Sequence, residues 1–164
     1  MENKKHNLSQ IFTLEEFIPY RLAVLAKSVS TAFSKTYAEQ FGITVPQWRV
    51  MAAIGRDPHC TASSIVEHAA MDKVQVSRAV SGLLAMGHLE SYLNENDRRS
   101  AVLSFSKKGQ SIYDQIVPAG LDFEAKLMSV MSNEDLVQLD KLFTKLALQA
   151  KKIQLTDPYL FYIS

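Results

Sequence analysis

The sequence has 164 residues and is 47% hydrophobic, which is enough for one folded domain with a buried core. Its formal net charge of +1 excludes a protein that binds nucleic acid through overall charge alone. No apolar run approaches the roughly 18 residues of a membrane span, and the first ten residues lack the apolar region of a secretory signal. We therefore expect a cytoplasmic protein with no membrane contact.

The N-terminal part of the chain is predicted to be one long amphipathic helix, from Thr13 to Gln40. Thr13 and Glu16 have the spacing of a capping box, and Gly42 is the residue type that ends a helix. Apolar side chains recur on one side at helical spacing, at Ile18, Leu22, Leu25, Val29 and Phe33. Arg21 lies at the edge of this stripe. Its side chain extends to solvent or pairs with a carboxylate, or else it anchors an anionic ligand.

Two short helices are predicted next, and a tight link joins the second of them to a longer helix. A short helix runs from Val45 to Gly55, with Trp48 in the core, and a second short helix runs from Thr61 to His68. Residues 69–71 link the second one to a longer amphipathic helix. Two helices joined in this way are typical of a helix-turn-helix, although this link lacks the glycine often found there.

The longer helix spans Asp72 to Gly87, and its two sides differ in chemistry. Asp72 and Gln75 form a capping-box-like pair at its start, and Gly87 ends it. The side predicted to face the core carries Val76, Val80, Leu83 and Leu84. The opposite side carries Val74, Arg78, Ser81 and Ala85. Arginine suits guanine, serine and glutamine suit base edges or phosphate, and a methyl-bearing side chain suits thymine. Helical period alone would fit any amphipathic helix.

After Gly87 the hydrophobic period changes to two, which predicts two short strands that flank residues 94–100. The strand positions are Leu89, Ser91, Leu93, Ala101, Leu103 and Phe105. The tip of this hairpin carries two adjacent arginines, Arg98 and Arg99. Behind a helix of this kind, they are placed to contact phosphates or a minor groove.

The C-terminal part is predicted to be helical again. A long helix runs from Lys107 to about Met131, bent by Pro118 and Gly120. Ser132 and Asp135 form a capping box for a last helix. That helix turns Leu136, Leu139, Leu142, Phe143 and Leu146 inward. The tail, residues 157–163, is apolar, and we expect it to pack against something, for which a partner subunit is a natural candidate.

Taken together, these elements resemble the MarR family of winged-helix transcription regulators over nearly the whole chain. Residues 42–54, GITVPQWRVMAAI, resemble the family's entry into the second helix, and residues 61–87 resemble its helix-turn-helix. Asp97, Arg98 and Arg99 followed by residues 104–109, SFSKKG, resemble the wing and its exit strand. Phe105 and Ser106 replace the leucine and threonine that are usual in that strand.

The resemblance implies a mainly α fold with a small β wing, a winged helix-turn-helix embedded in a helical dimerisation bundle. It places dimerisation in residues 1–40 and 107–164 and DNA binding in residues 41–106. It implies a homodimer on a palindromic site in double-stranded DNA, most simply a repressor. Arg99 would enter the minor groove, with Asp97 orienting the wing. The other DNA-binding residues would be Lys73, Val74, Gln75, Ser77, Arg78, Ser81 and Arg98.

Members of this family release DNA when a small anionic or aromatic ligand binds. We interpret Arg21 as the partner of a carboxylate or phenolate, with Tyr20, Trp48 and Met51 lining the apolar part of the site. The sequence names neither the ligand nor the operator, and it implies no cofactor.

Four alternatives stay open at this stage. Cys60 could act as a redox switch rather than as a small buried hydrophobe. His59, Cys60 and His68 are too irregularly spaced to favour a metal site. No phosphate loop, nucleophile elbow or carboxylate cluster indicates an enzyme. A winged helix could also serve protein contacts instead of DNA, since a fold does not determine a function.

Overall fold

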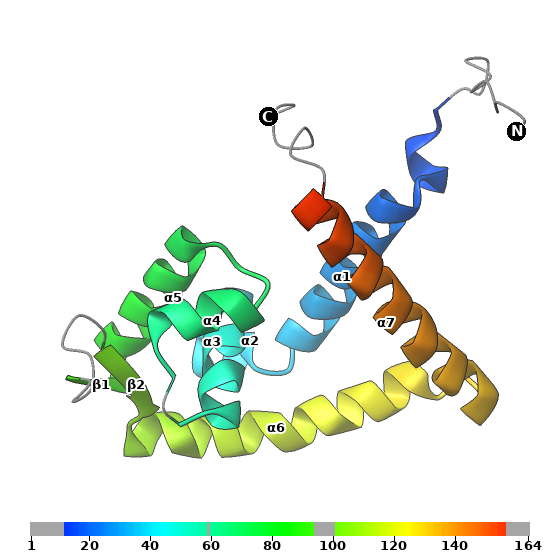
Figure 1. Cartoon of the computed structure of the whole chain (residues 1–164). Coiled ribbons are helices and arrows are strands. Elements are labelled where there is room, and N and C mark those ends of the chain that lie inside the picture. The colour runs from blue at the N-terminus through cyan, green and yellow to red at the C-terminus, as the bar shows by residue number, and fades with distance from the viewer. Residues whose placement is uncertain (1–11, 59, 94–100, 157–164) are drawn as a thin grey trace, which may run out of the picture. The chain divides into compact units, whose positions relative to one another are not determined.

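The computed structural model describes residues 12–58, 60–93 and 101–156. The chain divides into two compact units, residues 1–120 and 121–164, and helices dominate both (Figure 1). The mainly helical fold with a small β wing is confirmed. The predicted division into dimerisation and DNA-binding regions stays a prediction, because it depends on a second chain.

The N-terminal helix is shorter than predicted. Residues Leu14–Glu16 form a 3-10 turn, α1 spans Ile18–Ser34, and a separate short helix, α2, spans Ala38–Phe41. The side chain of Thr13 makes no capping hydrogen bond, so the capping box expected there is wrong. The helix breaks near its end because the hydroxyls of Ser34 and Thr36 donate to backbone carbonyls of the last turn. Gly42 ends α2 with a φ of +67°, as predicted.

The helix-turn-helix is formed by three capped helices, α3 (Val45–Arg56), α4 (Ala62–His68) and α5 (Lys73–Ala85). Each begins with a capping box, built by Thr44 and Gln47, by Thr61 and Ser64, and by Asp72 and Gln75. The link between α4 and α5 turns at Ala70, whose φ is +48°. The missing glycine noted in the sequence therefore leaves an L-residue in the left-handed region.

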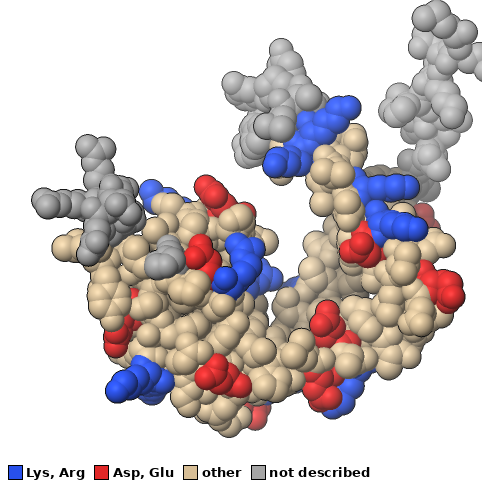
Figure 2. Space-filling view, turned by 60° about the horizontal axis from the view of Figure 1, so that its bottom comes forward, with Lys and Arg blue, Asp and Glu red and all other residues tan. Residues whose placement is uncertain are grey.

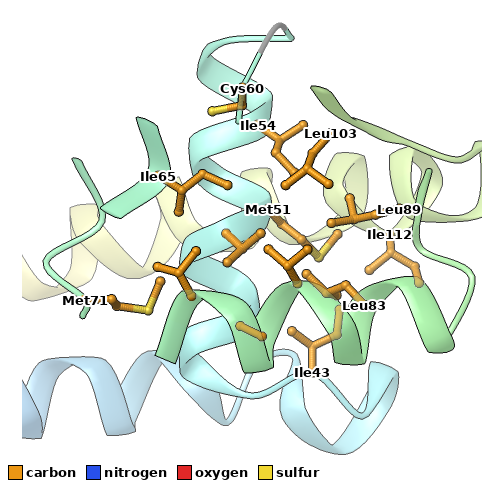
Figure 3. Close-up of a cluster of buried hydrophobic side chains, with 14 of the residues drawn as sticks. Ile43, Met51, Ile54, Cys60, Ile65, Met71, Leu83, Leu89, Leu103 and Ile112 are labelled. Atoms are coloured by element: carbon orange, nitrogen blue, oxygen red, sulfur yellow. The ribbon is translucent and has the colours of Figure 1, made fainter. Parts of the chain in front are cut away.

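The core lies among α3, α4, α5, the two strands and the start of the next helix, α6 (Figure 3). Of the α5 residues predicted to face it, Val76, Val80 and Leu83 are buried, whereas Leu84 is 36% exposed. Leu84 lies about 80° around the helix from Val76, at the edge of the buried face, and Ala79 is buried in its place. The assignment of Leu84 to the core was therefore wrong.

The predicted strands are confirmed as β1 (Leu89–Leu93) and β2 (Ala101–Phe105), an antiparallel pair in which Leu89 lies opposite Phe105. Thr61 adds an isolated bridge to Val102, which ties the start of α4 to the sheet. The connection between the strands, with Asp97, Arg98 and Arg99, lies outside the described residues.

Two long helices follow, α6 (Lys107–Met128) and α7 (Asn133–Thr156). The expected interruption at Pro118 does not end α6, which continues for another ten residues. At Gly109 α6 packs directly on the backbone of His88, because a Cβ there would lie 1.8 Å from the His88 carbonyl oxygen. Among the described residues, no helix is long and apolar enough to cross a membrane.

The last helix begins as predicted but leaves its apolar side uncovered. The Ser132 hydroxyl accepts from the Asp135 amide at 3.2 Å, and the Asp135 carboxylate accepts from the Ser132 amide at 3.0 Å. The apolar residues expected to face inward include Phe143, which is 50% exposed. In a single chain, the inward orientation predicted for this side of α7 is not observed. The apolar tail, residues 157–163, lies outside the described residues.

Candidate nucleic-acid interface

The outer face of α5 has the orientation that the sequence predicts. All six α5 residues assigned to DNA are exposed: Lys73, Val74, Gln75, Ser77, Arg78 and Ser81. Val74 is 57% exposed, which is unusual for an isopropyl group on a helix that also has a buried side. The exposed face therefore combines a guanidinium, hydroxyls, an amide and an exposed apolar side chain.

Gln75, one of these exposed residues, takes part in the α5 capping box with both its backbone amide and its side chain. The Asp72 carboxylate accepts from the Gln75 backbone amide at 2.7 Å. In return, the Gln75 Oε1 atom accepts from the Asp72 backbone amide at 3.4 Å. Two reciprocal hydrogen bonds thus hold the start of α5, and one of them orients the Gln75 side chain.

A hollow of about 430 Å³ separates α4 from α5. Its polar lining comes from Ser63 and Glu67 on α4 and from Lys73, Ser77 and Ser81 on α5. On the face that Figure 2 shows, basic side chains are scattered among acidic ones and form no continuous patch. The lining of the α4–α5 hollow likewise carries both signs, with Glu67 on α4 and Lys73 on α5, so recognition there would depend on the placement of individual groups more than on bulk charge.

A second hollow, of about 410 Å³, lies between α3 and the end of α4. Trp48 forms an apolar wall, and Arg49, Arg56 and His68 bring nitrogen donors to it. The Arg49 guanidinium also donates to the Ala70 carbonyl at 3.4 Å. We call this the α3–α4 hollow. The predicted ligand site did not include Arg49 and Arg56, although their seven-residue spacing already indicated one helix face.

The hollows formed by the described residues separate the four residues assigned to a ligand site. Tyr20 and Arg21 line an apolar groove of about 570 Å³ along α1, together with Leu22 and Leu25. Trp48 lines the α3–α4 hollow instead. Met51 is fully buried in the core.

An aromatic stack connects the α3–α4 hollow to the sheet. Trp48 stacks on Tyr113 of α6, with ring centroids 5.9 Å apart. Tyr113 in turn lies 5.0 Å from the ring of Phe105 on β2. The wall of the hollow and the strand that leads out of the wing are thus parts of one packed cluster.

Cys60 has the environment of a structural residue. It is buried, its thiol donates to the Ala53 carbonyl at 3.7 Å, and its sulfur accepts from the Ser64 hydroxyl at 3.5 Å. A buried thiol of this kind is a poor candidate for a redox switch, because reactive cysteines lie in contact with solvent. Among the described residues, no group of three His, Cys, Asp or Glu side chains is placed to hold a metal ion. His59 lies outside them.

Comparison with known proteins connects this geometry to transcription regulators. Residues 41–100 match the model of the MarR family. The HTH-type transcriptional regulator BilQ of Clostridium symbiosum is 27% identical over 116 residues, which cover 71% of this chain and 81% of BilQ.

Solved structures with the same fold include regulators studied with DNA and with a small molecule. BpsR of Bordetella bronchiseptica, whose structure concerns regulation of DNA binding by 6-hydroxynicotinic acid, superposes with a TM-score of 0.73 at 18% identity, over 84% of this chain and 97% of BpsR. A mutant MarR of E. coli in complex with operator DNA superposes with a TM-score of 0.70 at 22% identity, over 83% of this chain and 99% of that one.

Proposed function

We propose that the chain is a transcriptional regulator of the MarR family, whose model matches residues 41–100, and that it acts as a homodimer on a palindromic DNA operator. The observation that carries the proposal is the exposed face of α5, where Val74, Arg78 and Ser81 stand opposite a buried side. A helix of this length enters the major groove, and its N-terminal residues contact base edges.

Each exposed residue of α5 has a distinct role in the proposal. Arg78 donates two parallel hydrogen bonds to guanine O6 and N7, and the Val74 isopropyl group contacts a thymine methyl. Lys73, Ser77 and Ser81 bind phosphates or base edges, which fixes the register of the helix. In the wing, Arg98 and Arg99 contact the backbone and minor groove, with Asp97 orienting the loop, as the family resemblance implies.

Exposed apolar side chains support the dimer. Leu22 and Leu25 on α1 are 40% and 55% exposed, and Leu142 and Phe143 on α7 are 55% and 50% exposed. Apolar surfaces of this extent on a soluble protein mark contact sites. A second copy of the chain would remove them from water and supply the second half-site contact that a palindrome requires.

We further propose that a small aromatic or anionic ligand releases the protein from DNA, so that it acts as a repressor. The α3–α4 hollow supports this, since it offers the Trp48 indole for stacking and the Arg49 and Arg56 guanidinium groups for a carboxylate. BpsR, of the same fold, responds to an aromatic acid. Tyr20 and Arg21 remain proposed contributors, whereas Met51 is enclosed in the core and is not proposed again. Arg21 would join the site only if the dimer brings it there.

Binding of the purified protein to a pool of randomised DNA duplexes at two salt concentrations tests the DNA proposal. We expect enrichment of a palindrome and binding that weakens steeply as salt rises, because several phosphates are neutralised in each dimer. Arg99→Ala should weaken binding to all duplexes alike. Binding that responds neither to salt nor to sequence would instead indicate a module for protein contacts.

The ligand proposal has its own test. A panel of aromatic acids that includes 6-hydroxynicotinic acid is titrated into the complex with the enriched duplex, and DNA release is measured. We expect one acid to release the DNA, and Arg56→Ala to raise the concentration required by about tenfold, as expected for a lost charge-assisted hydrogen bond. Arg21→Ala tests the α1 position separately. Release that neither variant changes would contradict both assignments.

A further inference from the structure

His88 is a buried titratable residue that takes no part in the proposed DNA contacts. It is 2% exposed, and within the described part of the chain neither nitrogen of its imidazole has a hydrogen-bond partner. A neutral imidazole has one N–H donor and one acceptor nitrogen, and burying both of them unpaired costs free energy. Stability alone does not account for a histidine at this position, because an apolar side chain would avoid that cost.

The backbone of His88 completes the C-terminal cap of α5. Its amide donates to the Leu83 carbonyl at 2.9 Å, and the Gly87 amide donates to the Leu84 carbonyl at 3.0 Å. With Gly87 at a φ of +67°, these two bonds form a Schellman motif. The next residue, Leu89, begins β1, the strand that leads to the wing. A displacement of His88 would therefore change both the end of α5 and the start of β1.

Hydrogen bonds also fasten this segment to the start of α6. The His88 carbonyl accepts from the Ser106 amide at 3.1 Å, and the Ser106 hydroxyl donates to the Gly87 carbonyl at 2.7 Å. The Lys108 ammonium donates to the Met86 carbonyl at 3.1 Å. We call this set of contacts the α5–α6 junction. It connects the helix proposed to enter the major groove, the first strand of the wing and α6.

The charged groups around the junction do not favour a proton on His88. Burial is the main reason that the pKa of the imidazole lies below its usual 6.5, and the positive charge of Lys108 on α6 adds to it. Lys107 on α6 and Glu90 on β1 are exposed. The C-terminal half of α5 and the whole of β2 carry no titratable side chain. Among the described residues no carboxylate is buried, so a protonated His88 would have no enclosed acidic partner.

We infer, on the basis of the proposed DNA-binding function, that His88 is a proton-sensitive switch that weakens DNA binding as the pH falls. The neutral imidazole stays enclosed and keeps the α5–α6 junction closed. The protonated imidazole is driven toward water, because a buried cation without an acceptor is costly. Its movement loosens the junction and displaces the end of α5 and the start of β1 from the positions that reach DNA.

The expected direction is opposite to that of ordinary electrostatics. An exposed histidine such as His68 gains positive charge on acidification, which strengthens the attraction to phosphates. The open form of the junction binds its proton with the usual pKa near 6.5, so its population rises by up to about tenfold between pH 7.5 and pH 5.5. DNA affinity should fall by about threefold or more over this range, up to that limit.

Fluorescence anisotropy with the selected duplex at pH 7.5 and pH 5.5, at constant ionic strength, tests the switch. His88→Leu places an apolar side chain that binds no proton, so we expect it to lose the fall in affinity. His68→Gln is the matched control. It removes an exposed imidazole from α4 and should keep the fall. Circular dichroism at both pH values verifies that each protein is folded under the conditions of the assay.

A second measurement uses the wild type alone. Nuclear magnetic resonance follows the His88 imidazole through a pH titration of the free protein and of its complex with DNA. Because protonation and DNA binding are reciprocally linked, a ring whose proton weakens DNA binding must have a lower pKa in the complex. This measurement decides the case even if His88→Leu does not fold.

Three results would overturn the inference. The first is a wild-type affinity that is unchanged or higher at pH 5.5. The second is an equal fall in the wild type and in His88→Leu, which would assign the fall to other groups. The third is an imidazole that titrates identically with and without DNA. All three leave the proposed DNA-binding function in place. A wild type that selects no sequence at pH 7.5 would overturn that function, and the switch with it.

Discussion

Apolar side chains are buried in the helix-turn-helix and its strands, but they are exposed on the first helix, α1. Around α3, α5 and the sheet these side chains are enclosed, as Leu83 at 0% exposed illustrates. On α1 none of them is buried, and Leu25 is 55% exposed. The first region completes its core within one chain. The second has the amphipathic pattern of a packed helix, yet none of its described side chains is buried, which agrees with the proposed dimer.

Removing a core side chain should have the largest effect. Leu83→Ala deletes a side chain enclosed by α3, β1 and α6, so we expect the free energy of unfolding to fall by about 2–5 kcal/mol. Leu84→Ala, at the edge of the same helix face, should cost less than about 1 kcal/mol. Urea unfolding monitored by circular dichroism measures both. Equal losses would contradict the boundary of the core described here.

A charge on α1 should act on assembly and leave the fold intact. Leu25→Glu places a carboxylate in the surface that the proposed dimer buries, so dimer affinity should fall by about hundredfold, or roughly 3 kcal/mol. Lys27→Glu, an exposed change on the same helix, is the control. Sedimentation velocity reports the monomer fraction. A fully dimeric Leu25→Glu would show that α1 is not the interface.

Shortening Arg78, the arginine proposed to contact guanine, should weaken DNA binding and leave the fold intact. Arg78→Ala is expected to lower affinity for the selected duplex by about 1–3 kcal/mol and to relax preference at one base pair. Ser77→Ala, one position away on the same turn, should cost less. Fluorescence anisotropy with labelled duplexes gives both values, and a loss that is uniform over all sequences would identify Arg78 as a phosphate contact instead.

Acidification should weaken the junction between the sheet and α6. Burial, and then the positive charge of Lys108, hold the pKa of the His88 imidazole below its usual value of 6.5. The unfolded chain therefore binds a proton more readily, so stability is complete above about pH 6.5 and declines as the pH falls toward the lower folded pKa. Thermal melts at pH 7.5 and 5.5 measure this decline. His88→Leu should reduce it, and an unchanged decline would assign it to other groups.

The smallest effect concerns the turn of the helix-turn-helix. Ala70 has a φ of +48°, which glycine adopts without steric cost. Ala70→Gly should raise the free energy of unfolding by about 0.5–1 kcal/mol, whereas Ala69→Gly, with ordinary backbone angles, should lower it. Loss of stability in Ala70→Gly would mean that the side-chain methyl contributes more packing than the turn costs.

The sequence predicts the helix-turn-helix and its strands better than it predicts the N-terminal helix. Capping residues such as Asp72 and Gly87, and the change of period after it, are local signals, and they located α5 and both strands within a residue or two. The break after Ser34 could not be read, because it depends on hydroxyl groups that compete with the helix for its last carbonyls.

The two candidate sites also differ in how well the sequence predicts their residues. The exposed face of α5 follows from helical geometry alone, so its residues were identified correctly as outward-facing. The α3–α4 hollow joins residues almost twenty positions apart, Arg49 and His68, which no local period brings together. Met51 and Trp48 lie on the same helix, yet only one of them lines the hollow.

The most direct test of the central claim is a methylation-interference footprint on the duplex that the protein selects. It scores guanine N7 atoms, the major-groove groups that α5 is proposed to contact. The account predicts two tracts of interference related by a dyad and centred about one helical turn, or a whole multiple of it, apart. A single tract, or affinity that no N7 methylation changes, would contradict a dimer that reads bases through α5.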